Sequence, residues 1–262
     1  MKLVPFLTAM VGGLLFSTAA MSADAPGAAE LAAKLSDLQQ DGSTFIRVKM
    51  IVSSPANPSD PKTTLQLQIK SRRSAGQTDV VYQVLFPKER KGEAVLISSS
   101  GNGATFTPPD KLQTFDAAKF KESLLGSDLS YEDVSDNFFA WKDQSLAGTE
   151  TVSNVSCQIL ESKPKGARSS YTSVKSWIDT KRMVPLRVEK YGAGGQLVRR
   201  IDTSDVANVD GRNVLAMLVI RRPGHATATE MDGSRIKRGV AYTDADFTAE
   251  GLKNLSGPKG GE

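Results

Sequence analysis

Alternation of apolar and polar residues in four consecutive segments constrains the fold of this chain more than any other feature. Residues 45–52, 65–70, 79–86 and 93–99 place apolar side chains at every second position. Because successive side chains of a strand point to opposite faces of a sheet, this period of two predicts strands with one apolar and one polar face. The short turns between the segments indicate an antiparallel meander with one covered side.

Other patterns interrupt this alternation. Residues 28–38 carry apolar side chains at helical spacing and predict an amphipathic helix before the first strand. Residues 106–111 contain two prolines, which cannot donate to a strand ladder, so we expect the sheet to break there. Residues 117–125 predict a second helix, and residues 130–135 a further helical turn. We expect this stretch to separate two halves of the sheet or to form a lid over one of them.

The second half of the chain returns to strand patterns and ends in a short amphipathic segment. The predicted strands cover residues 138–143, 150–161, 170–179, 184–191, 197–203, 213–220 and, more weakly, 225–231, and a closing helix covers residues 244–255. The sequence therefore predicts a mainly β protein with few helices.

The N-terminal residues predict export. Lys2 precedes an uncharged, mostly apolar stretch over residues 3–20, and small residues lead up to Ala23. This order is typical of a secretory signal, so we expect a signal peptide over residues 1–23 and a periplasmic mature protein. An uncleaved membrane anchor is the alternative that the length of the stretch permits. No cysteine lies near the expected cleavage site, so we expect no lipobox and no N-terminal lipid.

Length and composition favour a single domain, expected over residues 24–256 and followed by a disordered tail over residues 257–262. The net charge of +4 is too small to predict nucleic-acid binding. Paired arginines, as at Arg199 and Arg200, are interpreted as solvated strand ends, and the alternative is a patch for anionic lipid headgroups. The single cysteine, Cys157, cannot form an internal disulfide and is expected to be a small buried apolar residue.

Residues that could carry chemistry are few. One cysteine and one histidine, His225, nearly exclude a zinc site of the usual ligands, and we expect no metal, no cofactor and no enzymatic activity. The acidic group Asp128, Glu132, Asp133 and Asp136 could form a calcium loop or a pair of catalytic carboxylates. Its spacing matches no calcium loop, however, and acids in a first helical turn are explained by helix capping, which we prefer.

Several motifs recur in the order found in a known family. They are Phe86-Pro87 and Gly92, the segment Gly126-Ser127-Asp128-Leu129-Ser130-Tyr131-Glu132-Asp133, Trp177-Ile178-Asp179, Pro185-Leu186-Arg187, Tyr191 with Gly195, and Phe247-Thr248. Their order and spacing over residues 40–256 resemble the LolA-like family of outer-membrane lipoprotein-sorting proteins.

This resemblance implies both a fold and a function. The fold is an incomplete antiparallel β-barrel of about eleven strands with helices covering its mouth. The function is transport of lipoprotein acyl chains across the periplasm in an apolar cavity, from an inner-membrane transporter to an outer-membrane acceptor. A free lipid, such as a phospholipid or a hopanoid-like molecule, is equally consistent as the cargo. An exposed acyl chain gains about 0.8 kcal/mol for each methylene that is buried, so such a cavity suits a passive carrier.

The apolar faces of the first strands supply the candidate lipid-cavity residues, and the predicted second helix supplies the candidate lid contacts. The cavity residues are Ile46, Val48, Met50, Leu65, Leu67, Ile69, Val84, Phe86, Val95 and Ile97, and the lid contacts are Leu124 and Leu125. For any one of them, ordinary core packing is the alternative. Two other functions stay open: an accessory docking protein of an envelope transporter complex, and an envelope hydrolase that uses the acids of residues 128–136.

Overall fold

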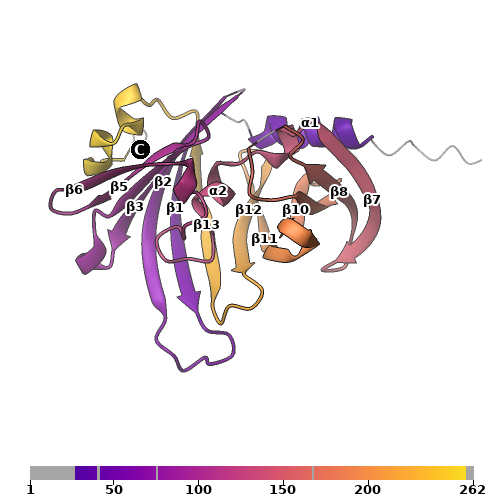
Figure 1. Cartoon of the computed structure of the whole chain (residues 1–262), viewed down its shortest axis with the longest axis horizontal. Helices are drawn as coiled ribbons and strands as arrows, with labels where there is room; N and C mark the ends of the chain where they lie inside the picture. The colour runs from indigo at the N-terminus through magenta and orange to yellow at the C-terminus, as the bar shows by residue number, and fades with distance from the viewer. Residues whose placement is uncertain (1–26, 40–41, 75, 167, 258–262) are drawn as a thin grey trace, which may run out of the picture.

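In the computed structural model, the described residues form one antiparallel sheet of thirteen strands that does not close on itself (Figure 1). The structure describes residues 27–39, 42–74, 76–166 and 168–257. The predicted signal peptide and residues 258–262 of the predicted tail therefore lie outside the described residues. The spatial order of the strands is β6-β5-β4-β3-β2-β1-β13-β12-β11-β10-β9-β8-β7, so β6 and β7 are the two free edges. The predicted incomplete barrel is confirmed, with two strands more than expected.

The strands of the two halves are connected mostly by short turns. Their bounds are β1 (Gly42–Ser53), β2 (Thr63–Ser74), β3 (Gln77–Phe86), β4 (Ala94–Ser98), β5 (Asn102–Thr107), β6 (Lys111–Asp116), β7 (Asp143–Val152), β8 (Val155–Lys163), β9 (Ser173–Asp179), β10 (Val184–Tyr191), β11 (Leu197–Val209), β12 (Arg212–Arg221) and β13 (Ala228–Arg238). The four segments with the clearest alternation correspond to β1 to β4, as predicted.

The two prolines interrupt the strand, as predicted, because β5 ends at Thr107 and β6 begins at Lys111, but the predicted break of the sheet at this point is wrong, because β6 pairs with β5. Pro108 and Pro109 occupy the turn of a hairpin between β5 and β6, where neither has to donate to a ladder. The sequence pattern missed β6 because it is an exposed edge strand without an apolar face, and it missed β5 because Gly103, Ala104 and Thr105 show no alternation of large apolar and polar residues. The predicted strand over residues 150–161 is two strands, which turn at Ser153 and Asn154, both with positive φ.

Three helical or strand predictions are also corrected by the structure. Residues 117–125 contain only a 3₁₀ turn, η2 (Ala117–Lys119), followed by turns and bends with one bridge between Ser123 and Ser130. Residues 138–140 form the 3₁₀ turn η3 (Phe138–Ala140) instead of a strand. The closing helix is two 3₁₀ turns, η5 (Asp244–Phe247) and η6 (Glu250–Lys253). In each case tertiary contacts override a local pattern that is too short to fix its own conformation.

Helix α1 (Ala28–Gln39) covers the inner face of the second half of the sheet, as Figure 1 shows at the upper right. Its apolar stripe, Leu31, Ala32 and Leu35, packs with Phe138, Phe139 and Trp141 against Leu160, Val174, Ile178 and Val188 of the sheet. The predicted amphipathic helix is therefore confirmed.

The C-terminal segment covers the outer face of the first half of the sheet. Phe247 and Leu252 pack against Val81, Leu96 and Phe106, which point outward from β3, β4 and β5. Two buried amides complete the contact: Gln83 donates to the backbone oxygens of Leu252 and Asn254, and Gln68 donates to Gln83 and to the oxygen of Leu255. The first half of the sheet is thus covered on both faces.

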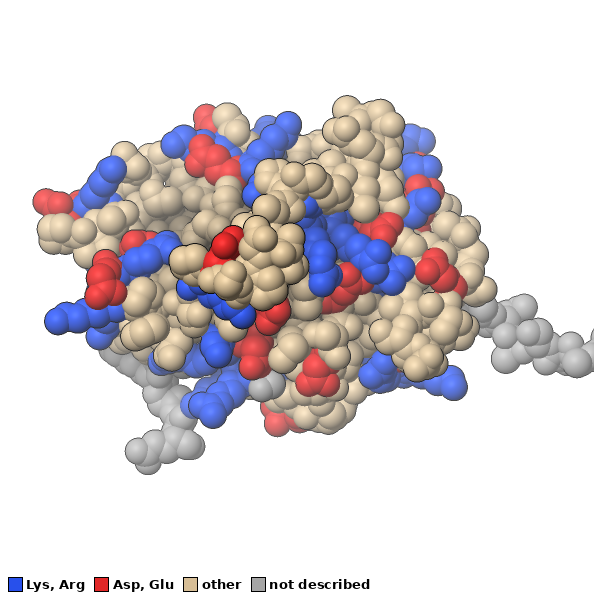
Figure 2. All heavy atoms as spheres, turned by 90° about the horizontal axis from the view of Figure 1, so that it is seen from below, with Lys and Arg blue, Asp and Glu red and all other residues tan. Residues whose placement is uncertain are grey.

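The face of the molecule in Figure 2 carries interspersed acidic and basic side chains. This distribution matches the small net charge of +4. None of the helices in the described ranges is long and apolar enough to cross a membrane.

We predict that the outer C-terminal segment stabilises the sheet through Leu252. This side chain is fully buried, so Leu252→Ala should lower the free energy of unfolding by about 2–4 kcal/mol. Leu146→Ala on edge strand β7 is the matched control, because Leu146 is 40% exposed and its truncation should cost less than about 1 kcal/mol. Urea unfolding monitored by circular dichroism measures both, and equal losses would contradict this assignment.

Candidate functional site

The inner faces of β1 to β4 form a continuous apolar surface, which we call the inner wall. Cross-strand pairs align its side chains, as in Met50 opposite Leu65 and Val80 opposite Ile97. Of the predicted cavity residues, Val48, Met50, Leu65, Leu67, Ile69, Val84, Val95 and Ile97 are buried in this cluster, and Ile46 is partly buried against it. The structure therefore brings nine of the ten predicted cavity residues together.

Phe86 is the exception, because it is 50% exposed and does not join the inner wall. β3 has a bulge near its end. Leu67 of β2 pairs with Val84, but its neighbour Gln66 pairs with Phe86, so that Leu85 is the extra residue in β3. The extra residue reverses the alternation, and Phe86 lies on the outward face beside Gln66. A bulge cannot be recognised from the spacing of apolar residues. The spacing of two between Val84 and Phe86 therefore predicted, wrongly, that both lie on the same face.

The inner wall is covered by the connection between β6 and β7, residues 117–142, which we call the crossing segment. Figure 1 shows its short helix α2 (Tyr131–Ser135) between the two halves of the sheet. Leu124, Leu129 and Tyr131 are buried against the inner wall, and Leu125 is partly buried there. Both predicted lid contacts thus lie on the inner wall, although they come from an irregular turn instead of a helix.

The crossing segment leaves little free space on the inner wall. A cavity of about 210 Å³ is lined by Ile46, Ile69, Val80 and Tyr82, next to Leu38 at the end of α1. Ligand pockets are usually about 300–1,000 Å³, so this space, which Thr44, Ser71 and Arg73 also line, is too small for a long acyl chain.

Phe115 of β6 connects the sheet edge to the crossing segment. Its ring stacks on Tyr131 with the ring centroids 5.0 Å apart. The ring also lies directly over Gly103 of β5, where an added Cβ would be 2.2 Å from Cζ of Phe115. Glycine at position 103 is therefore required for this stack.

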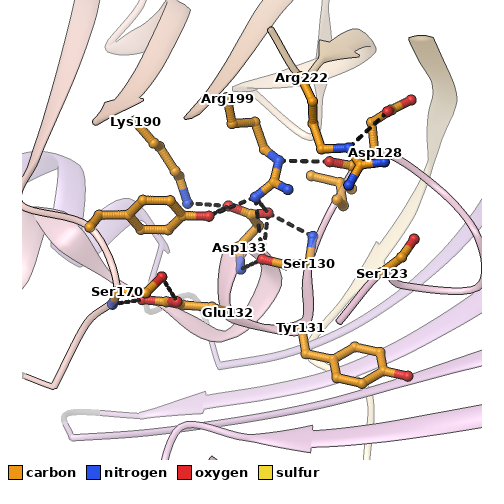
Figure 3. Close-up of polar contacts among 12 residues, drawn as sticks. Ser123, Asp128, Ser130, Tyr131, Glu132, Asp133, Ser170, Lys190, Arg199 and Arg222 are labelled. Carbon is orange, nitrogen blue, oxygen red and sulfur yellow. Dashed lines mark hydrogen bonds and ion pairs between the residues drawn. The ribbon is translucent and has the colours of Figure 1, made fainter. Parts of the chain in front are cut away.

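A buried carboxylate fixes the crossing segment to the second half of the sheet (Figure 3). Asp133 is fully buried, with Oδ1 2.9 Å from Nζ of Lys190 on β10 and Oδ2 paired with Arg199 on β11. The hydroxyl of Tyr171 donates to the same carboxylate at 2.8 Å. Asp133 also completes the capping box of α2 with Ser130. One carboxylate thus caps a short helix and forms ion pairs with two buried cations.

The environment of Asp133 favours its ionised form. Burial alone would raise the pKa of this carboxyl, but the charges of Lys190 and Arg199 outweigh burial and hold the pKa below its usual range. Burial also raises the pKa of Tyr171, so this hydroxyl remains protonated and can donate.

Asp128 makes a second buried anchor between the crossing segment and the sheet. Its carboxylate accepts hydrogen bonds from Thr227 at 2.9 Å and Thr229 at 2.8 Å, and it pairs with Arg222 at 3.2 Å. Arg199 Nε donates to the backbone oxygen of Asp128 at 2.6 Å, which couples the two anchors. Asp128 and Asp133 together hold the crossing segment against β10 to β13.

The preferred interpretation of the acidic group as helix caps is confirmed for Ser130 and Asp133, but it is incomplete. The sequence did not identify the partners Lys190, Arg199 and Arg222, which lie more than 50 residues away in the chain. The view of paired arginines as solvated strand ends is wrong for Arg199, which is 5% exposed. The sequence did carry a sign that Lys190 is buried. Lys190 lies two residues after the buried Val188 in β10, on the same face of the strand.

The remaining chemical candidates are explained by packing or by exposure. Cys157 is buried with Trp177 and Leu186 on the outer face of the second half, as expected for a small apolar residue. Burial raises the pKa of its thiol. His225 is exposed. Within the described ranges, no three His, Cys, Asp or Glu side chains are placed to hold a metal ion.

Comparisons with known proteins support the fold seen here. A family model described as "Uncharacterized protein" matches residues 76–254. The structure of a DUF1329 family protein from Desulfovibrio piger is similar with a TM-score of 0.77 and 21% identity, over 86% of this chain and 97% of that protein. No curated protein matches this chain in sequence.

Two further solved structures share this architecture. An outer membrane lipoprotein-sorting protein domain from Vibrio parahaemolyticus has a TM-score of 0.75 and 20% identity, over 87% of this chain and 98% of the domain. A LolA superfamily protein from Nitrosomonas europaea has a TM-score of 0.69 and 17% identity, over 86% of this chain and 98% of that protein.

We predict that Asp133→Asn lowers the free energy of unfolding by about 3–5 kcal/mol at pH 7, because it leaves Lys190 and Arg199 buried without a counter-charge. The folded-state pKa of Asp133 is below its unfolded value, so the stabilisation is complete above the unfolded pKa, near 4, and is lost as pH falls below it. The difference between wild type and variant should therefore shrink in acid. Urea titrations between pH 7 and pH 3 measure it, with Glu122→Gln in the same segment as the control. A constant difference across this range would contradict the ion-pair assignment.

The contribution of Asp136 to the free energy of unfolding should change with pH in the opposite direction to that of Asp133. Burial raises its pKa to about 6, although Lys190 opposes the shift. A raised folded-state pKa means that ionisation of Asp136 destabilises the protein as pH rises from about 4 through 6. Asp136→Asn should therefore increase the free energy of unfolding at pH 8 and change it little at pH 4. Thermal unfolding at the two pH values measures this, and a loss of stability at pH 8 would show that the ionised carboxylate is stabilising.

Proposed function

This chain belongs to the LolA-like family, and we propose that it is a periplasmic carrier of lipid or lipoprotein acyl chains, in which the cargo replaces the crossing segment on the inner wall. The apolar inner wall, covered by a segment outside the sheet, is the observation that carries this proposal. A wall built from strands of a single core would be filled by opposing strands or long helices. Here Leu124, Leu129 and Tyr131, from a connection with little regular structure, pack on it together with Ile220 and Met231 of β12 and β13.

An acyl chain can compete with these side chains on energetic grounds. Each buried methylene contributes about 0.8 kcal/mol, so a long chain offers more apolar burial than three side chains do. Displacement of the crossing segment returns its apolar residues to water and separates Asp128 and Asp133 from their partners. The cargo affinity is therefore the free energy gained by burying the acyl chain minus the free energy lost by displacing the crossing segment. Because the two nearly offset each other, both uptake and release are possible.

The ion-paired anchors give the carrier a defined empty state. A closed state that is favoured by a few kcal/mol protects the inner wall from water and from non-specific contacts. Strand edges β6 and β7 are not paired with each other, so these two edges can move apart when the crossing segment moves, while β1 and β13 keep the two halves joined. This arrangement needs no nucleotide, metal or covalent chemistry, in keeping with a non-enzymatic role.

The wider setting of this function follows from the predicted signal. We infer that a protein with a cleaved signal peptide over residues 1–23 acts in the periplasm, receives its cargo from an inner-membrane transporter and delivers it to an outer-membrane acceptor. The solved structures named as lipoprotein-sorting and LolA superfamily proteins support this place in outer-membrane lipoprotein sorting. A free lipid fits the same wall as a lipoprotein acyl chain does.

An accessory docking protein is the second candidate, and the filled inner wall is the observation that favours it. If the anchors at Asp128 and Asp133 never open, the same fold acts only through its surface. A hydrolase has less support, because both carboxylates are fully buried and ion-paired instead of lining a solvent-filled cleft. Glu132 borders a cavity, but its carboxylate accepts hydrogen bonds from Ser169 and Ser170.

We predict that Leu124→Ala makes room for an acyl chain on the inner wall. Leu124 is fully buried there, so its truncation leaves an apolar cavity that a hydrophobic ligand can enter. A fluorescent long-chain fatty acid should bind the variant about threefold or more tightly than it binds wild type. Leu160→Ala is the matched control, because Leu160 is equally buried but packs under α1, away from the inner wall.

Fluorescence titration of the three proteins and mass spectrometry of lipids extracted from the purified wild type provide the measurements. Both variants should lose about 2–5 kcal/mol of stability, but only Leu124→Ala should gain affinity. If no protein binds the fatty acid and no lipid is extracted, the docking role is favoured over the carrier. Equal gains in both variants would show that destabilisation alone causes the binding.

A further inference from the structure

The cavity of about 210 Å³ on the inner wall has an apolar part and a polar part. The apolar part is lined by the inner wall and by Ile236 of β13. The polar part is lined by Thr44 of β1 and by Ser71 and Arg73 of β2, at the ends of these strands nearest to α1. None of the described residues that line this cavity belongs to the crossing segment, so displacement of that segment leaves these walls in place.

Arg73 brings a positive charge to this cavity. It follows Ile69 and Ser71 at every second position of β2, so its side chain lies on the inner face. Burial lowers the pKa of its guanidinium. Within the described ranges, Arg73 has neither an ion pair nor a side-chain hydrogen bond, and its nitrogen atoms retain accessible surface. Since a guanidinium stays charged when it is buried, its desolvation is uncompensated in the empty protein.

Other buried cations of this fold have a carboxylate beside them. Lys190 and Arg199 share the carboxylate of Asp133. Lys70, on the opposite face of β2, lies 3.5 Å from a carboxylate of the C-terminal segment. Arg73 is partly buried without such a neighbour, and it lines a cavity. This difference indicates that the anion that balances Arg73 comes from a ligand.

Tyr82 of β3 supplies a second donor in the same cavity. Its hydroxyl makes no hydrogen bond with a described residue, and the oxygen retains accessible surface. Burial raises the pKa of Tyr82 to about 12, so the hydroxyl stays protonated and can donate. The positive charge of Arg73 opposes this shift, which places the guanidinium close to the hydroxyl. Two donors without partners thus lie together in the cavity.

The other polar groups of the cavity are donors as well. The hydroxyls of Thr44 and Ser71 lie 2.5 Å apart, and whichever of them accepts keeps its own hydrogen for a further bond. Arg238 of β13 also lines the cavity, and it donates to the backbone oxygen of Val209 at 3.2 Å. Hydroxyl and guanidinium donors therefore surround the polar part, which suits an anion.

The apolar part of the cavity continues into the inner wall. Ile46, Ile69 and Val80 line the cavity and belong to the same cluster as Met50 and Leu65. An amphiphile with its polar end at Arg73 would therefore have its chain directed along the surface that the crossing segment covers. The polar end and the chain would each meet groups of matching chemistry.

We propose that Arg73 and Tyr82 bind the carboxylate of a fatty acid, whose chain extends from this cavity along the inner wall. A carboxylate offers two oxygens to the planar fork of a guanidinium and can accept the tyrosine hydrogen as well. Its single charge matches the one arginine of the cavity without a partner, and its small size suits a cavity of about 210 Å³. The path of the chain rests on the proposed carrier function, whereas the carboxylate site can be measured without it.

Isothermal titration with octanoate, 1-octanol and 1-octylamine tests the site, because the three ligands differ only in their polar end. Octanoate should bind at least about tenfold more tightly than the alcohol or the amine. Arg73→Gln should reduce the octanoate affinity to that of 1-octanol and leave the affinity for 1-octanol unchanged. Tyr82→Phe should weaken octanoate binding about threefold. In the NMR spectrum of the wild type, octanoate should shift the Nε–Hε signal that is absent from Arg73→Gln.

Arg47→Gln is the matched control, because Arg47 is exposed on β1 and does not line the cavity. This variant should bind octanoate as the wild type does. Arg73→Gln should melt no lower than the wild type without ligand, since it removes a charge that has no partner. Equal affinities for octanoate and 1-octanol, unchanged octanoate binding in Arg73→Gln, or an equal loss in Arg47→Gln would overturn the site.

Octyl phosphate and palmitate separate the remaining possibilities. Octyl phosphate should bind no more tightly than octanoate, and tighter binding would overturn the assignment to a carboxylate. Palmitate should bind more tightly than octanoate and should lose affinity in Arg73→Gln. Octanoate binding that depends on Arg73, without palmitate binding, would contradict the carrier function but support the site. Palmitate binding that is unchanged in Arg73→Gln would overturn the site and leave the carrier function standing.

Discussion

The carboxylate of Asp133, held between Lys190 and Arg199, determines where the connection between the two sheet edges lies. These three charges are buried together, and the desolvation of each is offset only while all three remain in contact. Because Asp133 also caps α2, the ion pairs fix the orientation of this short helix as well as its position. The placement of Leu124, Leu129 and Tyr131 on the inner wall, and of Glu132 against Ser169 and Ser170, follows from this contact.

An open sheet with a displaceable cover solves a physical problem that a closed barrel does not. Small closed barrels are filled by their own side chains, so they admit a long apolar ligand only at the cost of their core. Here the first half of the sheet keeps part of its core on the outer face, where Phe247 and Leu252 pack. The inner wall can therefore exchange its cover without loss of all apolar packing around β3 and β4.

The crossing segment places apolar and charged side chains next to each other in the chain. Tyr131 packs on the inner wall, while the carboxylate of its neighbour Glu132 accepts hydrogen bonds from Ser169 and Ser170. The short helix α2 therefore connects the inner wall to residues 169–170.

The sequence by itself determined the inner face of β1 and β2, because apolar residues alternate with polar ones along both strands. In β3 and β4 both faces carry apolar residues, so only the tertiary structure decided which of them form the inner wall. The sequence also determined helix α1 and the cap of α2, since both depend on local spacing. Only the tertiary structure decided the outward position of Phe86, because a bulge shifts the register without altering composition. Tertiary structure likewise decided the pairing of Asp133 with Lys190 and Arg199, which lie more than 50 residues away along the chain. Long-range ion pairs and bulges depend on how strands pair with one another in three dimensions, and this pairing cannot be predicted from the pattern of residues within one segment.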